Sequence, residues 1–348
     1  MKTSNTPPFA TRRVLSTARL SFPLASAIAA LFASQTMHAA NIWDGGAGTG
    51  DWNTPSNWDN DSVPSANAIL TFANNSTGFT TNDTTADRQY NGFLFTNNGT
   101  WSNNSTFTLA GNRITLGGNI GTTAPTANTT ITDIISLDMI LDGNRTITTN
   151  QGATYSQHDL ISSGIISSSG NFSLTKAGNA TLILSGDNTY TGSTTVSGGA
   201  RQINGANSGN GAVIVAAGTT FGGSGNVIGG INVTGVLSPG DSAPSIESFH
   251  GGALSFGKTS TYAYQLQTLG LNVNGDLAHS TSTLTIATGA ILSLTDISTS
   301  TVRSNGEKLT LIRYTGAGAW NGELFSYNSN ILVDGFEINL GANKWMLK

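Results

Sequence analysis

Short runs of alternating apolar and polar residues recur along most of this chain. From about Phe107 onward, each run of four to six residues is followed by a cluster rich in Gly, Asn, Asp, Ser or Thr. Alternation places the apolar side chains on one face of a strand, and Gly and Asn tolerate the backbone conformations of tight turns. The pattern therefore predicts an all-β protein made of many short strands. The runs are FTLAG, RITLGG, MILDGN, TLILSGDN, TTVSGG, AVIVAAG, INVTG, ALSFG, TLTIATG, AILSLTD and LTLIRY.

The spacing of these runs separates two β architectures. A β-sandwich closes through long-range pairing and usually ends within roughly one or two hundred residues, whereas these runs are spaced evenly over more than two hundred residues. A parallel β-helix instead coils, so that each strand stacks on the next at about 4.8 Å, with turns of roughly 20–25 residues. We therefore predict a single-stranded parallel β-helix, or solenoid, which is right-handed because parallel crossovers almost always are.

The composition fits an ordered, lightly charged protein. Of 348 residues, 10% are charged and 37% are hydrophobic, and the chain contains 43 glycines. Disordered segments lack such regular apolar runs. The chain has no cysteine, which excludes disulfides, thiolate metal ligands and a cysteine nucleophile. Its stability must then come from backbone hydrogen bonds and packing.

The first forty residues differ from the rest of the chain. They contain four basic residues and no acidic one. The apolar run LSFPLASAIAALFA, residues 20–33, has the length of a signal-peptide h-region and is too short to span a bilayer. Residues 1–40 are therefore predicted to be a secretory signal peptide that is cleaved after Ala39 or Ala40. The basic residues are Lys2, Arg12, Arg13 and Arg19.

Removal of this segment changes the charge of the protein. Four of the 15 basic residues would be lost, which leaves 11 against 19 acidic residues and a net charge of −8. An acidic surface argues against nucleic acid and anionic membranes as partners. After residue 40 no apolar run approaches the length of a membrane span, so we expect no integral membrane segment in the mature chain.

The segment GNATLILSGDNTYTGSTTV, residues 178–196, is the most distinctive motif of the chain. It resembles the autotransporter-associated β-strand repeat, or passenger-associated transport repeat, whose pattern is approximately G-x-G-T-L-T-L-S-G-x-N-T-Y-T-G-G-T-T-V. The likeness covers residues 174–203 and departs from the pattern at Asn179-Ala180 and at Arg201, where the following strand normally has leucine. The resemblance implies one turn of a pectin-lyase-like β-helix in an exported bacterial surface passenger.

The motif residues have expected structural roles. Leu182 and Leu184 share one strand face and Val196 repeats the apolar step after the turn, so we expect all three in the core. The ring of Tyr190 is expected to cover the next coil while its hydroxyl meets solvent. A catalytic pair of Asp187 and Tyr190 is the less favoured alternative, since a lone acid in a turn usually shapes the turn. The residues of the structural repeat are Gly178, Leu182, Leu184, Ser185, Gly186, Asn188, Tyr190, Gly192 and Val196.

Three tryptophans open the predicted mature chain in a setting rich in Asn, Gly and Asp. Trp43, Trp52 and Trp58 resemble the tryptophan-rich start of exported passengers. We favour a cap that covers the first coil, because a stack of strands must be closed at its end. The alternative is a glycan contact through ring stacking. Residues 41–106 are thus assigned to the cap and first coils, and residues 107–348 to the β-helix.

The sequence offers no convincing catalytic or metal site. GGAGTGDWN at residues 45–53 nearly matches a calcium-binding nonapeptide, but Asp51 lies one place late, so no metal or other cofactor is expected. Asp133, Asp138 and Asp142 lie close in sequence, but their spacings of five and four residues do not guarantee the common cleft in which two carboxyls would flank one glycosidic bond. A β-helix polysaccharide lyase or glycoside hydrolase is therefore the weakest alternative.

These observations favour an exported structural protein. We expect a secreted or cell-surface β-helix that resembles an autotransporter passenger, lacks a membrane barrel of its own, and is held at the surface by non-covalent contacts. A glycan-binding adhesin is the main alternative. Its expected partners are surface polysaccharides or other cell-surface proteins.

Overall fold

The computed structural model describes most of the chain after residue 40. The chain divides after His38, and all the described residues belong to the second unit. The predicted signal peptide, residues 1–40, lies outside the described residues. The first strand, β1 (Asn41–Trp43), begins at the residue that follows the later predicted cleavage position. The described residues are 41–73, 78–96, 106–125, 130–152, 156–240, 246–269, 272–297, 310–315, 325–327, 330–331, 337–340 and 343–346.

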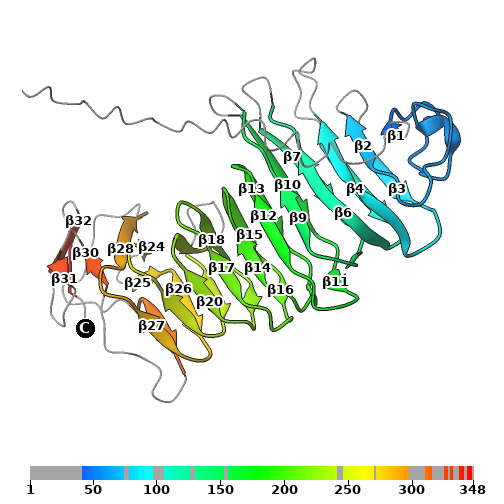
Figure 1. The fold of residues 1–348 in the computed structure, drawn as a ribbon. Helices are drawn as coiled ribbons and strands as arrows, with labels where there is room; N and C mark the ends of the chain where they lie inside the picture. The colour runs from blue at the N-terminus through cyan, green and yellow to red at the C-terminus, as the bar shows by residue number, and fades with distance from the viewer. Residues whose placement is uncertain are drawn as a thin grey trace, which may run out of the picture. The chain divides into compact units, whose positions relative to one another are not determined.

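The described strands form a parallel β-solenoid in which each coil adds one strand to each wall (Figure 1). The first wall, called sheet A here, begins at β1. Two further strands belong to sheet A but lie off its main order: β8 (Met139–Leu141) pairs with β6, and β11 (Ile166–Ser168) pairs with β8. The order of sheet A is β1, β2 (Leu70–Ala73), β4 (Arg88–Thr96), β6 (Ile114–Thr122), β9 (Arg145–Thr148), β12 (Leu174–Ala177), β14 (Thr194–Val196), β17 (Val213–Val215), β20 (Ile231–Val233), β23 (Leu254–Phe256) and β27 (Leu284–Ile286).

The second wall, sheet B, runs opposite sheet A. It ends in an antiparallel pair, and β25 (Asn272–Gly275) also pairs antiparallel with β24. The order of sheet B is β3 (Gly78–Asn82), β5 (Phe107–Gly111), β7 (Thr130–Ile135), β10 (Gln157–Ser162), β13 (Thr181–Leu184), β15 (Ala200–Ile203), β18 (Thr220–Gly223), β21 (Val236–Pro239), β24 (Thr261–Leu269), β28 (Ile291–Asp296), β30 (Ser326–Tyr327) and β31 (Asn330–Ile331).

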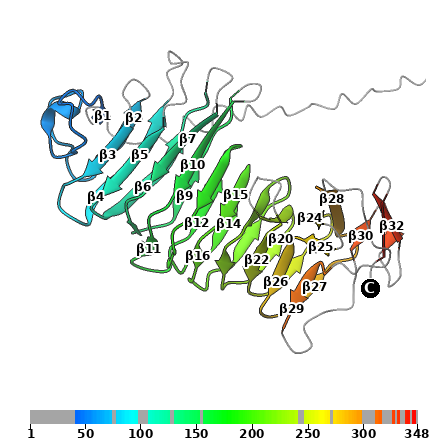
Figure 2. The ribbon, with the colours of Figure 1, turned by 180° about the vertical axis from the view of Figure 1, so that it is seen from behind.

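A third wall appears only in the later coils, and Figure 2 shows several of its strands from behind. This sheet C is ordered β16 (Ala206–Asn207), β19 (Asn226–Val227), β22 (Ser248–Gly251), β26 (Leu277–Ser280) and β29 (Ile312–Tyr314). An antiparallel pair, β32 (Glu337–Leu340) and β33 (Asn343–Met346), follows in sequence. The predicted all-β solenoid is thus confirmed.

Helix is almost absent from the described part of the chain. The one helical element there is a single 3₁₀ turn, η1 (Pro55–Asn57). Within the same residues, no helix has the length and apolarity needed to cross a membrane.

The coils are less uniform than the sequence predicted. Hydrogen bonds between adjacent coils span 28 residues where Asn112 meets Thr84, but only 19 where Ala206 meets Asp187. The early coils are longer because β4 and β6 have nine residues each, whereas β14 and β17 have three. The expected turn of roughly 20–25 residues therefore describes the middle of the solenoid better than its beginning.

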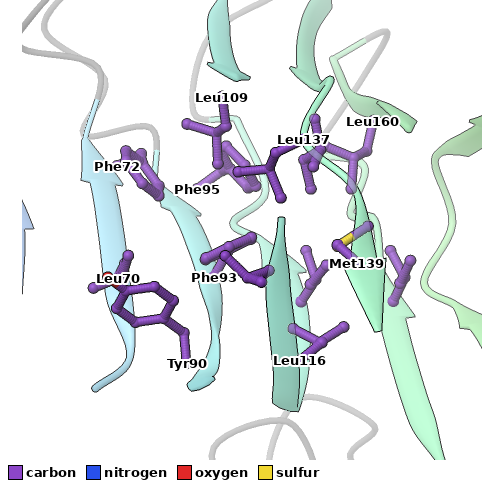
Figure 3. Close-up of a cluster of buried hydrophobic side chains, with 14 of the residues drawn as sticks. Leu70, Phe72, Tyr90, Phe93, Phe95, Leu109, Leu116, Leu137, Met139 and Leu160 are labelled. Atoms are coloured by element: carbon purple, nitrogen blue, oxygen red, sulfur yellow. The ribbon is translucent and has the colours of Figure 1, made fainter. Parts of the chain in front are cut away.

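Side chains alternate between the solenoid interior and its surface, as the pleat of a strand requires. β17 buries Val213 and Val215 and exposes Ile214, and β13 buries Leu182 and Leu184. In the early coils the interior is filled by large apolar side chains from both walls, which Figure 3 shows meeting between the strands. The labelled residues are Leu70, Phe72, Tyr90, Phe93, Phe95, Leu109, Leu116, Leu137, Met139 and Leu160.

The three N-terminal tryptophans form the predicted cap. Trp43, Trp52 and Trp58 are at most 2% exposed. Trp58 meets both other rings edge to face, at centroid distances of 5.2 and 6.2 Å, and Trp52 packs on Phe72 of β2. The indole N–H of Trp52 donates to Thr80 Oγ1, and that of Trp58 donates to the Trp52 carbonyl. The rings therefore close the first coil, and they present no open face for the alternative role of glycan stacking.

Asn and Asp side chains join one coil to the next at the turns. Asp138 accepts a hydrogen bond from the Ile165 N–H at 2.7 Å, and Asn144 accepts one from the Ser173 N–H at 2.9 Å. Asp187 accepts in the same way from Ala206. These contacts satisfy backbone donors that leave the strand ladders, which explains the abundance of these residue types at the corners.

Substitution on the two faces of β17 tests the inward and outward assignment. Val215 is fully buried and Ile214 is 43% exposed, although the two are neighbours on one strand. We expect Val215→Asp to cost at least about 3 kcal/mol of unfolding free energy, because it buries an unpaired carboxylate. Ile214→Asp should cost about 1 kcal/mol or less, from strand propensity alone. Urea unfolding followed by circular dichroism measures both, and equal losses would contradict the assignment.

Candidate functional site

The distinctive motif at residues 178–196 forms one turn of the solenoid. β12 and β14 are adjacent in sheet A, and β13 and β15 are adjacent in sheet B. Leu182 and Leu184 of β13 and Val196 of β14 are fully buried, as their spacing predicted. The motif therefore supplies both walls of a coil together with the corners between them.

Glycine is required in this turn where neighbouring coils nearly touch. Gly178 has a φ of 77°, and a Cβ there would lie 2.1 Å from the carbonyl oxygen of Thr149 in the preceding coil. Gly186 and Gly192 have ordinary φ values, but a Cβ at either would lie within 2.3 Å of a carbonyl oxygen of the coil before. The motif glycines thus allow the close stacking of corners, and any side chain would push the coils apart.

Asn188 ties three segments together inside the corner. Its Oδ1 accepts a hydrogen bond from the Ile166 N–H at 2.9 Å, and its Nδ2 donates to the Gly186 carbonyl at 2.8 Å. It also forms a parallel bridge with Asn207 of the next coil. Ser185 by contrast is exposed, and its N–H donates to the Ser162 carbonyl. The asparagine of the motif is therefore a buried structural link.

The position of Tyr190 differs from the expectation that its hydroxyl is solvated. The side chain is fully buried. Its hydroxyl lies 2.6 Å from Thr194 Oγ1 and accepts hydrogen bonds from Arg201 Nη2 at 2.9 Å and Asn207 Nδ2 at 3.1 Å. With two donors directed at the oxygen, the tyrosine proton goes to Thr194, and the hydroxyl is saturated. The Tyr190 side chain points inward because Thr194 of its own coil and Arg201 and Asn207 of the next coil supply hydrogen-bond partners inside the solenoid.

Asp187 does not share this environment. It is exposed, and its carboxylate accepts the Ala206 N–H at a corner. The less favoured catalytic pair of Asp187 and Tyr190 is therefore not assembled, because one residue points to solvent and the other into the solenoid.

The turn also buries two cations, which the sequence did not suggest. Lys176 of β12 and Arg201 of β15 are both fully buried. The Lys176 ammonium donates to the carbonyls of Ala177, Gly178 and Gly198 at 2.7–3.1 Å. Arg201 lies between Leu182 and Phe221 on the adjacent strands, in a column of apolar side chains. Its departure from the repeat pattern thus places a guanidinium where the repeat normally has leucine.

Burial shifts the protonation of this lysine. Loss of hydration lowers the pKa of Lys176 to about 7, an effect that the Asp159 carboxylate opposes and the positive charge of Arg201 reinforces. The same loss of hydration raises the pKa of Asp159, which lies on the outer side of β10.

The three aspartates considered as catalytic candidates have different surroundings and different hydrogen-bond partners. Asp133 is fully buried, and its Oδ2 lies 2.6 Å from His158 Nε2 while its Oδ1 accepts the Phe107 N–H. His158 Nδ1 faces the Thr123 carbonyl at 2.9 Å. Both ring nitrogens therefore lie within hydrogen-bonding distance of oxygen atoms of the fold. This pair is closed off from substrate.

The other two aspartates make structural contacts. Asp138 accepts the Ile165 N–H, as described above, and Asp142 forms an ion pair with Arg145 and accepts a hydrogen bond from Gln89. Each of the three carboxylates is thus already engaged by another group of the fold. The described residues also contain no group of three or more His, Asp or Glu side chains that could hold a metal ion.

The glycine-rich loop at residues 45–53 is organised by a side chain that the sequence did not single out. Asn57 is fully buried. Its Oδ1 accepts the Ala47 N–H, and its Nδ2 donates to Thr49 Oγ1 and the Asp51 carbonyl at 2.9–3.0 Å. An amide thus fixes the loop by hydrogen bonds, where a calcium loop would present carboxylates.

Comparison with known proteins agrees with this geometry. Residues 174–200 match the family model described as passenger-associated-transport-repeat. No curated protein and no solved structure matches the chain. The protein is thus a parallel β-solenoid in which one turn matches the passenger-associated transport repeat.

Removal of the Tyr190 hydroxyl tests the buried polar cluster. Tyr190→Phe leaves the Arg201 and Asn207 donors without their acceptor, so we expect a loss of about 3 kcal/mol of unfolding free energy. Tyr314→Phe removes a hydroxyl from a tyrosine that is 40% exposed, and it should change the unfolding free energy by less than about 0.5 kcal/mol. Urea unfolding gives both values. In an Arg201→Leu background the cost of Tyr190→Phe should fall, and an unchanged cost would contradict the coupling.

The lysine predicts a particular dependence of stability on pH. Its pKa is about 7 in the folded protein and close to 10.5 in the unfolded chain, so the unfolded chain binds more protons between these values. The unfolding free energy contributed by Lys176 should therefore rise from pH 7 to pH 10, and its destabilising effect is complete below pH 7. Lys176→Met should remove this rise, whereas the exposed Lys258→Met should keep it. Parallel slopes in all three proteins, measured by urea unfolding across this range, would contradict the assignment.

Proposed function

We propose that the protein is an exported structural module of the bacterial cell surface or extracellular space, similar to an autotransporter passenger. The passenger-associated repeat at residues 174–200, built into a continuous parallel solenoid, is the observation on which the proposal rests. The partners of this module would be surface polysaccharides or other cell-surface proteins.

The use of polar residues within the fold supports a structural role over an enzymatic one. The candidate carboxylates Asp133, Asp138 and Asp142 are engaged with His158, a backbone N–H and Arg145 respectively. The tryptophans that an adhesin would use to stack against sugars are buried in the N-terminal cap. A structural module needs neither, because its working feature is the regular surface of stacked coils.

Export with cleavage near Ala40 is the first consequence to test. The full chain is produced in a bacterium with two membranes, cells are fractionated, and the mature N-terminus is determined by mass spectrometry. We expect a chain that begins at Ala40 or Asn41 in the periplasm or medium, washed from membranes by urea. As a matched control, Leu31→Asp interrupts the h-region and should leave the uncleaved chain inside the cell.

Two results would contradict the proposal. One is a chain that keeps Met1 while Leu31→Asp changes nothing. The other is an exported chain that cleaves a surface polysaccharide in a reducing-end assay, which would assign an enzymatic role instead.

A further inference from the structure

The solenoid interior changes character at the repeat. One cluster of apolar side chains extends from Trp43 to Tyr190, and a second extends from Val196 to Phe325. Between them, apart from Asn188 at the corner, lie four buried polar side chains, each at most 2% exposed. The apolar core is therefore divided by a polar layer within the coils that carry the passenger-associated repeat. The four residues are Lys176, Thr194, Arg201 and Asn207.

Arg201 is the least satisfied group of this polar layer. Its Nη2 donates to the Tyr190 hydroxyl, but Nε and Nη1 have no hydrogen-bond partner among the described residues, and the side chain is fully buried. Arginine stays protonated in proteins, so the guanidinium cannot escape the cost of burial by losing its charge. A buried charge without a counter-charge is strongly unfavourable, and such a group calls for a partner.

No carboxylate of the described residues supplies that partner. Asp133 lies in the same inward column, but Leu160 and Leu182 separate it from Arg201, and it is already paired with His158. Three strand spacings of about 4.8 Å place it roughly 14 Å away. Asp159 lies on the outer side of its strand and accepts the Thr181 N–H.

The neighbouring groups increase the positive potential of the polar layer. Lys176 is buried close enough to Arg201 for the positive charge of Arg201 to lower the pKa of the lysine. Asn207 adds no positive charge, because its Nδ2 donates to the Tyr190 hydroxyl and its Oδ1 is an acceptor that has no partner among the described residues. The layer thus holds a permanent cation with two unpartnered N–H groups, Nε and Nη1 of Arg201, and a second cationic side chain, Lys176, all of them buried.

We propose that a single small anion of the halide class binds inside the solenoid against Nε and Nη1 of Arg201. A halide accepts hydrogen bonds and supplies the missing negative charge, which a water molecule would not. It also fits an enclosed site better than an oxyanion such as sulfate, which needs more donors and more room. Because the side chains around it are buried, the anion is taken up as the coils close on folding and becomes part of the core.

Thermal unfolding of the purified full-length chain tests this site. The chain is refolded and melted in sodium chloride, sodium bromide or sodium gluconate at constant ionic strength, since gluconate is too large to enter. A ligand that binds the folded state alone stabilises it by about 1.4 kcal/mol for each tenfold rise above its Kd. We expect each tenfold rise in chloride or bromide to raise the Tm by about 2–4 °C relative to gluconate.

Two variants separate a specific site from general salt effects. Arg201→Leu restores the usual residue of the repeat, so it should fold and lose the halide dependence. Arg113→Leu removes an exposed arginine that pairs with Asp87, and it should keep the dependence of the wild-type chain. Equal halide slopes in the wild-type and Arg201→Leu chains would overturn the proposal.

A diffraction experiment tests the same site without any variant. Crystals grown in sodium bromide should give an anomalous peak within hydrogen-bonding distance of Arg201 Nε and Nη1. A map with no bromide there, whether the region holds water or closes on itself, would overturn the proposal. The site does not depend on the export function proposed above, so failure of either leaves the other standing.

Discussion

The backbone hydrogen bonds between successive parallel strands hold each coil to the next, and they impose the spacing of everything else. Strands of neighbouring coils lie about 4.8 Å apart, so side chains at equivalent positions form continuous inward columns. One such column passes through Leu160, Leu182, Arg201, Phe221 and Leu237. Each member must fit between its neighbours above and below. A change in one coil is therefore felt first by the two coils beside it.

This spacing explains the composition of the corners. Where coils turn, backbone passes over backbone, and Gly178 and Gly192 leave no room for a Cβ. Backbone donors that leave the ladders there are satisfied by side chains such as Asn144 and Asp138. Low overall charge follows from the same constraint, because amides and small hydroxyls fill corners without repelling their counterparts one coil away.

The repeat adds a polar layer to this largely apolar stack. Tyr190 organises it, since one hydroxyl serves Thr194, Arg201 and Asn207 at once. Buried polar groups stabilise a unique arrangement only when they are fully satisfied. Within this layer the tyrosine is saturated while the guanidinium is only partly so, and the proposed anion would complete the set. A layer of this kind would also fix the register of the coils on either side, as buried polar groups do in other stacked structures.

The sequence by itself determined the fold class, the inward positions of Leu182, Leu184 and Val196, and the capping role of the tryptophans. These follow from local periodicity, because alternation decides which face of a strand is apolar. Only the tertiary structure decided which polar residues are buried and which groups they contact. The sequence did not suggest that Arg201 is buried, and it predicted a solvated hydroxyl for Tyr190. Both side chains are buried, because Tyr190 meets polar groups of the next coil inside the solenoid. The contacts of His158 with Asp133 and of Asn57 with its loop likewise join residues whose proximity depends on where the chain turns. The number of residues in each coil decides which side chains come into contact, and the local hydrophobic pattern does not encode that number.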